Sequence, residues 1–209
     1  MKHNITCPCG NNFPISYEEE IDIDENDEYL EKIFNGTFMS YNCPACKKKH
    51  KPEFGIMVIW KSKGLRLEVL PEMDRGGFYR RKKEAQDRKS AAYETIISFP
   101  EMADRLAVIK DGLEPIVIEV LKSYLLAKAD ENYPDKEINA WYHGTGPAGI
   151  EFHLDGIRKD EVAVMRIPQD LYDKTAADYR KNPKSGIFSS LRVRSYLSVQ
   201  NMLRHDALK

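Results

Sequence analysis

The sequence predicts an α+β protein with a β-rich N-terminal part and a C-terminal part that combines helices with a small sheet. Three observations support this fold class: two close cysteine pairs lie within the first 46 residues, apolar residues alternate with polar ones along several short runs, and two later runs place apolar residues at helical intervals. With 209 residues, 42 % of them hydrophobic, the chain suits one large domain or two small ones.

The N-terminal module is predicted over residues 1–72. Asn26 or Asp27 can cap a short inserted helix, which Asn35 and Gly36 would end. Alternation of apolar and polar residues predicts strands over 13–23, 37–42, 54–60 and 65–69. The last two strands flank a turn and should form a hairpin.

Residues 73–94 are charged and poor in apolar residues, so they predict a linker or a solvated helical arm before an α+β C-terminal domain over 95–209. Two helices, one after the capping residue Ser98 and one over 115–128, should pack as a helical hairpin. Alternating runs predict a small antiparallel sheet over 138–143, 150–154 and 162–167. C-terminal helices are predicted over 168–179 and 187–203.

The overall charge gives no indication of a nucleic-acid or membrane partner, because the formal net charge is −1. No apolar run approaches the roughly 20 residues of a membrane span, and the first residues lack the apolar core of a secretory signal. We therefore expect a cytoplasmic protein without a membrane partner.

Cys7, Cys9, Cys43 and Cys46 form two tight cysteine knuckles separated by a 33-residue insert. Structural zinc takes four tetrahedral ligands, and two such knuckles supply four thiolates, so the pattern predicts a zinc ribbon holding one Zn²⁺. The alternative is a set of free or redox-active cysteines. Four cysteines leave no open coordination position, which favours a structural metal over a catalytic one. His50 could replace a ligand, but among its neighbouring lysines it is expected to be solvated.

Several segments in order resemble the CpXC-domain family of bacteria and archaea, which is functionally uncharacterised. They are TCPCGNNF, an acidic insert closing with FNGTF, the knuckle YNCPACKKKH, and the pair ETIISFPEMADRLAVIKDGLEP and IVIEVLKSYLL. The resemblance runs from about residue 5 to residue 130 and implies a zinc ribbon followed by a helical segment, with no established activity. In this chain Lys47 stands where glycine is common in the family, and the first knuckle is shorter by one residue.

Charge is unevenly distributed along the chain. Residues 18–31 carry nine carboxylates and no base, whereas residues 47–51 and the last thirty residues are basic. One interpretation is solvation and mutual attraction of surfaces. The other is a nucleic-acid or partner-binding face formed by Arg80, Arg81, Lys82, Lys83, Arg192, Arg194 and Arg204.

The segment from Trp141 to Gly149 lacks the GxxxxGK[ST] phosphate-binding pattern, so we expect a wide hairpin loop there. If the predicted alternation is right, His143 and His153 lie on polar strand faces. Such a patch could perform acid–base chemistry, or its histidines could simply face solvent. No Ser/His/Asp or Cys/His arrangement indicates a nucleophile, because the cysteines are assigned to metal.

The hypothesis that these patterns favour is a non-catalytic zinc-binding adaptor, which could dock on a large cytoplasmic machine such as the transcription or translation apparatus. The alternatives are an enzyme that uses the polar C-terminal face and a protein that binds nucleic acid directly through its basic residues. The partner, any substrate and the oligomeric state cannot be predicted from these patterns.

Overall fold

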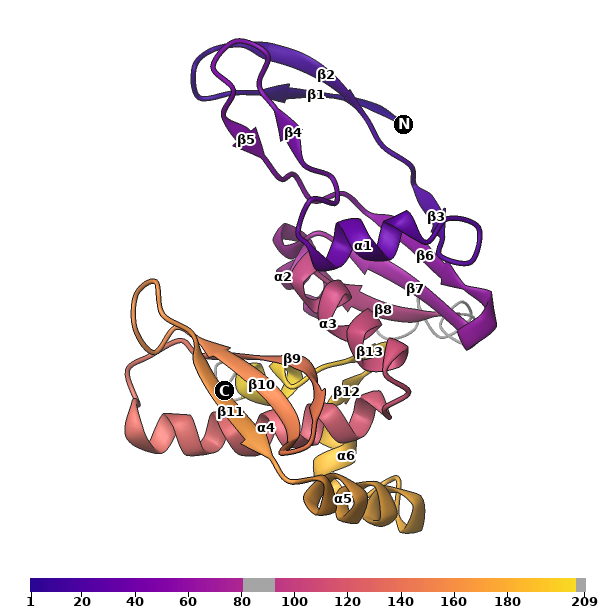
Figure 1. The fold of residues 1–209 in the computed structure, drawn as a ribbon, viewed down its shortest axis with the longest axis vertical. Coiled ribbons are helices and arrows are strands. Elements are labelled where there is room, and N and C mark those ends of the chain that lie inside the picture. Colours follow the sequence, from indigo (N-terminus) through magenta and orange to yellow (C-terminus); the bar gives the residue numbers. More distant parts are fainter. Residues whose placement is uncertain (81–92, 206–209) are drawn as a thin grey trace. The chain divides into compact units, whose positions relative to one another are not determined.

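The computed structural model describes residues 1–80 and 93–205. Both of its compact units, Met1–Ala103 and Asp104–Lys209, combine helices with small sheets, so the α+β prediction is confirmed (Figure 1). No helix of the described residues has the length and apolar character needed to cross a membrane.

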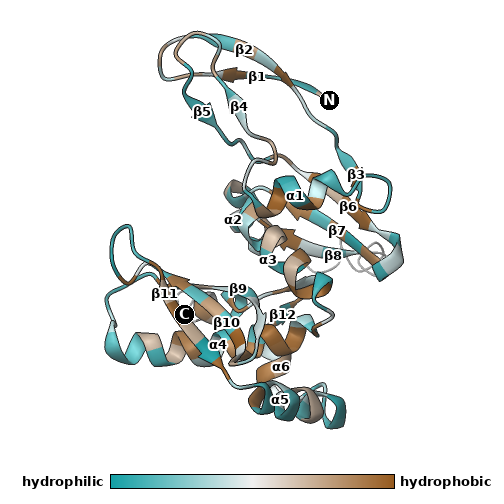
Figure 2. Ribbon diagram, in the orientation of Figure 1, coloured by the Kyte–Doolittle hydropathy of each residue, from teal (hydrophilic) through white to brown (hydrophobic). Residues whose placement is uncertain are grey.

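Two small hairpins carry the cysteines in the first unit. The first joins β1 (Lys2–Thr6) to β2 (Asn12–Ser16), and the second joins β4 (Tyr41–Asn42) to β5 (Lys49–His50). Figure 2 shows that β4 and β5 are largely hydrophilic, so these strands bury little apolar surface. In the described part of the chain, the buried cluster around the knuckles is small: it contains Cys7, Phe13, Ile15 and Cys43. Such a small core favours stabilisation by a metal.

The remainder of the first unit is built on a sheet with the order β8-β7-β6-β3. β6 (Ile56–Trp60) and β7 (Leu65–Leu70) form the predicted antiparallel hairpin, while β3 (Glu20–Asp22) runs parallel to β6, and β8 (Glu94–Ile97) parallel to β7. The alternation of side chains places one face in the core, since Val58, Leu67 and Val69 are fully buried.

Short helices complete this unit. The predicted inserted helix is α1 (Glu28–Phe34), with Asp27 as its N-cap residue. The 3₁₀ turn η1 (Lys61–Lys63) connects β6 to β7, and η2 (Glu72–Asp74) leads directly into α2 (Arg75–Arg80). The guanidinium of Arg75 is buried and ion-paired with Glu72 and Glu101 at 2.5 and 2.7 Å.

The helices and strands of the second half of the chain follow in order. α3 (Phe99–Lys110) spans the division between the two units, and α4 (Pro115–Asn132) belongs to the second. The sheet has the order β11-β10-β9, and both strand pairs are antiparallel. The remaining bounds are β9 (Asn139–Gly146), β10 (Gly149–Asp155), β11 (Ala163–Ile167), α5 (Gln169–Lys181), α6 (Gly186–Ser190), β12 (Arg192–Val193), β13 (Tyr196–Leu197) and α7 (Gln200–His205).

A buried charge network lies in the core of the second unit, beside α4. The Lys122 ammonium donates to the carboxylates of Asp104 at 2.5 Å and of Glu119 at 2.8 Å. Glu119 also accepts from the backbone N–H of Val199, and Asp104 from that of Tyr142, at 2.7 and 2.6 Å. These bonds satisfy charges that would be very costly to bury alone.

Four sequence predictions about elements differ from the structure. The strand over 13–23 is split into β2 and β3, and the returning strand over 37–42 is reduced to β4. The prediction of one helix over 187–203 is wrong, because α6 is followed by the β12–β13 hairpin. The turn of this hairpin contains Arg194 at a positive φ of 56°. The wide loop before Gly149 is also wrong: β9 and β10 extend to a turn of two residues.

The predicted linker over 73–94 contains α2 and the first residue of β8, while its residues 81–92 lie outside the described part of the chain. The division between the compact units falls after Ala103, later than the sequence prediction places it. The physical reason is the pairing of β8 with β7, which joins residues 94–97 to the first unit's sheet.

Candidate metal centre

The first knuckle is the turn that connects β1 to β2. Thr6 and Asn12 are the last paired residues, the N–H of Cys7 donates to the carbonyl of Asn11 at 2.9 Å, and the N–H of Gly10 donates back to the carbonyl of Cys7 at 2.9 Å. Gly10 has a φ of 86°, a conformation that glycine adopts without steric cost. The turn therefore holds Cys7 and Cys9 on one tight loop.

The second knuckle closes the β4–β5 hairpin by the same pattern of bonds. The N–H of Cys43 donates to the carbonyl of Lys48, and the N–H of Lys47 donates to that of Cys43, both at 2.9 Å. Lys47 has a φ of 61° and so occupies a left-handed conformation that usually favours glycine. The knuckle keeps its shape without glycine, with a residue held in a less favourable backbone conformation.

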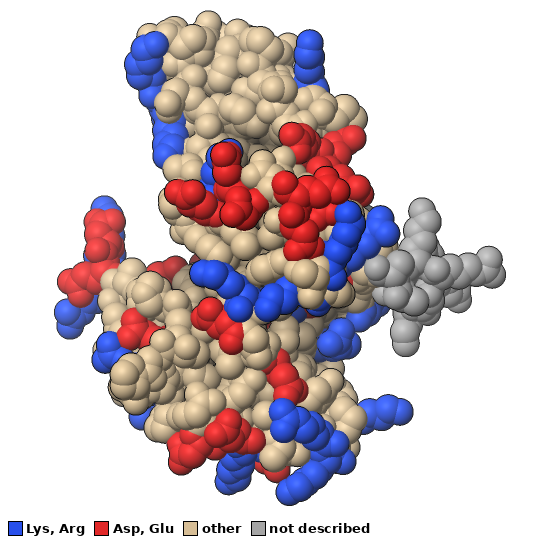
Figure 3. Space-filling model, turned by 45° about the vertical axis from the view of Figure 1, so that its right-hand side comes forward, with Lys and Arg blue, Asp and Glu red and all other residues tan. Residues whose placement is uncertain are grey.

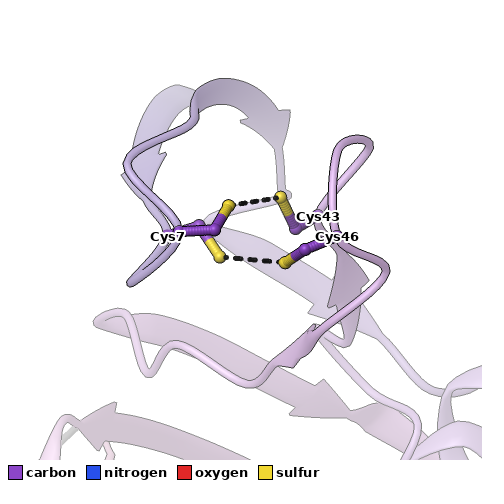
Figure 4. Close-up of side chains that lie close together, drawn as sticks. Cys7, Cys43 and Cys46 are labelled. Atoms are coloured by element: carbon purple, nitrogen blue, oxygen red, sulfur yellow. Dashed lines mark hydrogen bonds between the residues drawn. The ribbon is translucent and has the colours of Figure 1, made fainter.

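The two knuckles bring all four sulfur atoms together. The Sγ atoms of Cys7 and Cys46 are 3.6 Å apart, those of Cys9 and Cys43 are 3.7 Å apart, and all four lie within 4.8 Å of one another (Figure 4). Four sulfurs bound tetrahedrally to one zinc at about 2.3 Å would be separated by about 3.8 Å. A disulfide would bring two sulfurs to about 2.05 Å, and the four cysteines are free. The site therefore fits a tetrahedral metal ion.

Local hydrogen bonds perturb the two buried thiols in opposite directions. The backbone N–H of Cys46 is the largest influence on Cys43, and together with the N–H of Ala45 and the Asn11 amide it lowers the pKa of the Cys43 thiol to about 6. For Cys7, the backbone N–H of Cys9 favours the thiolate, but burial and the neighbouring thiols outweigh it and raise its pKa to about 12. One thiolate at neutral pH would start metal capture, and the cation would then displace the remaining protons.

Two further side chains contact the sulfurs. His50 lies on β5 and is half-buried, with its Nε2 3.2 Å from the Sγ of Cys7, and the amide nitrogen of Asn11 lies 3.6 Å from the Sγ of Cys43. The expectation of a solvated His50 is therefore wrong. Such partners hold ligands in position around a metal. The proximity of His50 follows from its pairing with Tyr41 across the hairpin, next to the knuckle.

The predicted basic residues are only partly described. Arg80 is exposed at the end of α2, Arg192 is exposed on β12, and Arg194 is half-buried after that strand. Arg81, Lys82 and Lys83 lie outside the described residues, as does the side chain of Arg204. A nucleic-acid or partner contact through this set stays a prediction.

The two histidines of the predicted polar patch do come together. The rings of His143 and His153 stack with centroids 3.7 Å apart, beside the carboxylate of Glu151. The stacking of His143 on His153 across β9 and β10 depends on a strand register that the sequence does not specify.

Comparison with known proteins gives two matches to this chain. A family model described as "CpXC protein" matches residues 5–122. An uncharacterised protein of Treponema pallidum (strain Nichols) is 28 % identical over 214 residues, which cover 95 % of this chain and 97 % of that protein. No solved structure matches the chain.

Proposed function

The chain belongs to the CpXC family, whose model covers more than half of it, and from this premise we propose that its four cysteines hold one structural Zn²⁺ in a zinc ribbon that serves as a protein-docking module. The observation that carries the proposal is the cluster of Sγ atoms within 4.8 Å of one another at the tips of two hairpins. Four thiolates suit zinc and leave no position for a substrate. The metal's role is then to fix the shape of a surface.

A cleft in the same unit offers a place for a partner. It has a volume of about 690 Å³ and lies between the cysteine hairpins and α1, with Tyr17, Tyr29, Phe38 and Tyr41 among its lining residues. Aromatic side chains provide large contact area at low entropic cost and are enriched at interfaces. The hydroxyl of Ser40, another lining residue, is buried without a hydrogen-bond partner among the described residues. Because that hydroxyl is shielded from solvent, the aromatic side chains are what the cleft offers a partner.

Charge indicates which kind of partner would bind. Acidic side chains gather in a band across the first unit (Figure 3), and the segment 18–31 contributes nine carboxylates. Several are engaged, as Asp22 and Glu25 are with Lys61. The exposed side chains of Glu20 and Glu31 form no ion pair within residues 1–80 and 93–205. A basic protein surface complements this band, and a component of a nucleic-acid-processing machine in the cytoplasm would provide one.

The test is a pull-down of the tagged full chain from its own host, with and without nuclease, for the wild type and for Glu20→Lys/Glu31→Lys. We expect a stoichiometric partner that survives nuclease and whose recovery falls severalfold with the charge reversal, since like charges across an interface oppose binding. Asp130→Lys, an exposed change on α4 in the other unit, is the matched control and should retain the partner.

Two outcomes would overturn the docking proposal. Loss of all bound protein after nuclease treatment would favour direct nucleic-acid binding, for which salt-sensitive retention on nucleic acid is the companion test. Recovery of the chain alone, with its zinc, would direct attention to chemistry in the second unit.

A further inference from the structure

The outer face of the β9–β10–β11 sheet carries an unusual group of side chains. The inner face belongs to the core, since Tyr142, Phe152 and Leu154 are buried. Of the outer residues, His143, Glu151 and His153 are 58 %, 23 % and 30 % exposed at their side chains. They are accessible from solvent, and each has a donor atom of a kind that binds metal.

A β-bulge brings His143 into this group. Tyr142 pairs with Phe152 and Gly144 pairs with Glu151, so His143 is the extra residue on β9 where the register shifts. A bulge bends the strand and redirects a side chain. Gly144 leaves open space opposite Glu151, where even an added Cβ would meet nothing within 4 Å. As a result His143 stacks on His153, with 15° between the ring planes.

The distances among the three side chains fit a shared cation. Oε1 of Glu151 lies 3.3 Å from Nε2 of His153 and 3.9 Å from Nε2 of His143. Two ligand atoms about 2.0–2.1 Å from a tetrahedral zinc would be about 3.4 Å apart. Because the ring planes are nearly parallel, the two imidazoles must turn out of their stack before both nitrogens can face one ion, and the solvent exposure of the side chains leaves room for that rotation.

Arg166 orients the carboxylate for this role. Its guanidinium binds Oε2 of Glu151 at 2.6 Å, from the directly paired position on β11, and leaves Oε1 directed at the histidines. Outer partners of this kind are common around metal ligands and fix their direction.

We propose that His143, Glu151 and His153 form a second metal site, separate from the four cysteines, which binds a divalent transition-metal ion such as Zn²⁺. Two imidazoles and one carboxylate suit zinc and the other divalent ions that prefer nitrogen and oxygen ligands. Three protein ligands leave at least one coordination position for water or a substrate, unlike the cysteine site. The second unit would thus carry the reactive metal and the first unit the structural one.

The experiment is a titration of the metal-free, reduced full chain with Co²⁺ and Zn²⁺, for the wild type, His143→Ala, His153→Ala and Glu151→Gln. A sulfur-to-cobalt charge-transfer band reports Co²⁺ at the cysteine site. Co²⁺ d–d absorption that appears without a charge-transfer band reports the second site. We expect two metal equivalents per wild-type chain. Each of the two histidine variants should lower the affinity for the second equivalent by more than about 100-fold, beyond the loss typical of an outer-shell change.

The controls separate this proposal from the cysteine site and from unfolding. The first equivalent should bind normally to all three variants, and His3→Gln, which removes an exposed histidine elsewhere, should leave both equivalents intact. Circular dichroism should match that of the wild type. The proposal is overturned if the wild type takes up one equivalent only, or if the histidine variants bind the second equivalent with unchanged affinity.

Discussion

At the scale of single residues, the four cysteines are the features whose chemistry depends most on one another. Cys7 and Cys43 are buried, while Cys9 and Cys46 are exposed at the loop tips. Removing one buried thiolate takes away a quarter of the ligand shell and half of the paired sulfur contacts around it. The consequence should therefore extend beyond the knuckle that carries the substitution.

Cys43→Ser is expected to lose the zinc of this site and to unfold at least the two cysteine hairpins. Structural zinc supplies on the order of 10 kcal/mol of folding free energy in small zinc domains, comparable to the whole stability of many proteins. Metal analysis and the dispersion of amide NMR signals measure the two effects. Ala45→Ser, in the same loop, should keep metal and fold. A fully structured Cys43→Ser protein would contradict the account.

His50 tests whether a partner of a ligand influences the metal. His50→Ala removes the imidazole that lies 3.2 Å from the Cys7 sulfur, and it should weaken zinc binding by about 10–100-fold while leaving the hairpins folded in excess zinc. Competition with a chelator of known affinity provides the measurement. Unchanged affinity would mean that the contact has no role in metal binding.

At the scale of elements, strand and helix spacing predicted more than the connections did. The β6–β7 hairpin, α3 and α4 follow from apolar periodicity, and the structure confirms them, as it confirms the helix predicted over 168–179 in α5. β8 was missed because it follows a charged stretch and pairs with β7 from a distance along the chain. The tight turn before Gly149 was missed because two-residue loops there depend on backbone angles, and Gly149 has a φ of 108°.

The candidate sites were predictable to different degrees for a related reason. The four cysteine positions could be named because their spacing alone specifies two knuckles. The contact of His50 with Cys7 and that of His143 with His153 both depend on strand register, which a one-residue shift would destroy. The burial of Lys122 could not be predicted, because its partners Asp104 and Glu119 are identified only by the three-dimensional packing around α4.

α4 provides the prediction for stability at this scale. Lys122→Met would leave the Asp104 carboxylate buried without its cation and Glu119 with the guanidinium of Arg105 alone, at 3.9 Å, and it should destabilise the second unit by about 3–5 kcal/mol. Denaturant unfolding followed by a probe in that unit measures the change. Lys128→Met, at an exposed position on the same helix, should change stability by less than about 0.5 kcal/mol.

The pH dependence of the free energy of unfolding gives a second check on the charge of Lys122, again by comparing the wild type with Lys122→Met. Burial tends to lower the pKa of Lys122, but its two carboxylate partners outweigh burial and raise it above the ordinary 10.5. A raised cationic pKa contributes stability that is complete below pH 10.5 and is lost as the pH rises through the folded-state value. The difference in the free energy of unfolding between wild type and Lys122→Met should therefore narrow as the pH rises above 10.5. If the difference in the free energy of unfolding did not change with pH, Lys122 would not be charged in the folded protein.

At the scale of the whole molecule, apolar burial is unevenly divided between the cysteine hairpins and the second unit. The second unit has an extended apolar core that runs from Val108 to Val199, whereas the cysteine hairpins of the first bury few apolar residues. The division of the chain after Ala103 could not be predicted, because it depends on which sheet β8 joins. Metal dependence should therefore be concentrated in the first unit.

Removal of metal by a strong chelator should separate these two contributions. We expect fast hydrogen exchange at the N–H groups of Cys7, Cys43 and Lys47, which close the knuckles, and retained protection at Phe152 in β10. Hydrogen–deuterium exchange with mass spectrometry or NMR measures both regions in one sample. Equal loss of protection throughout would show that the metal supports the entire fold.

The measurement that tests the central claim most directly is zinc X-ray absorption on a His143→Ala/His153→Ala chain carrying one equivalent of zinc. These substitutions remove the proposed second site, so the spectrum reports the cysteine centre alone. The account predicts four sulfur ligands at about 2.3 Å and no nitrogen or oxygen ligand. A first shell containing nitrogen or oxygen, or a chain that holds no zinc with its thiols reduced, would contradict a four-cysteine structural zinc site.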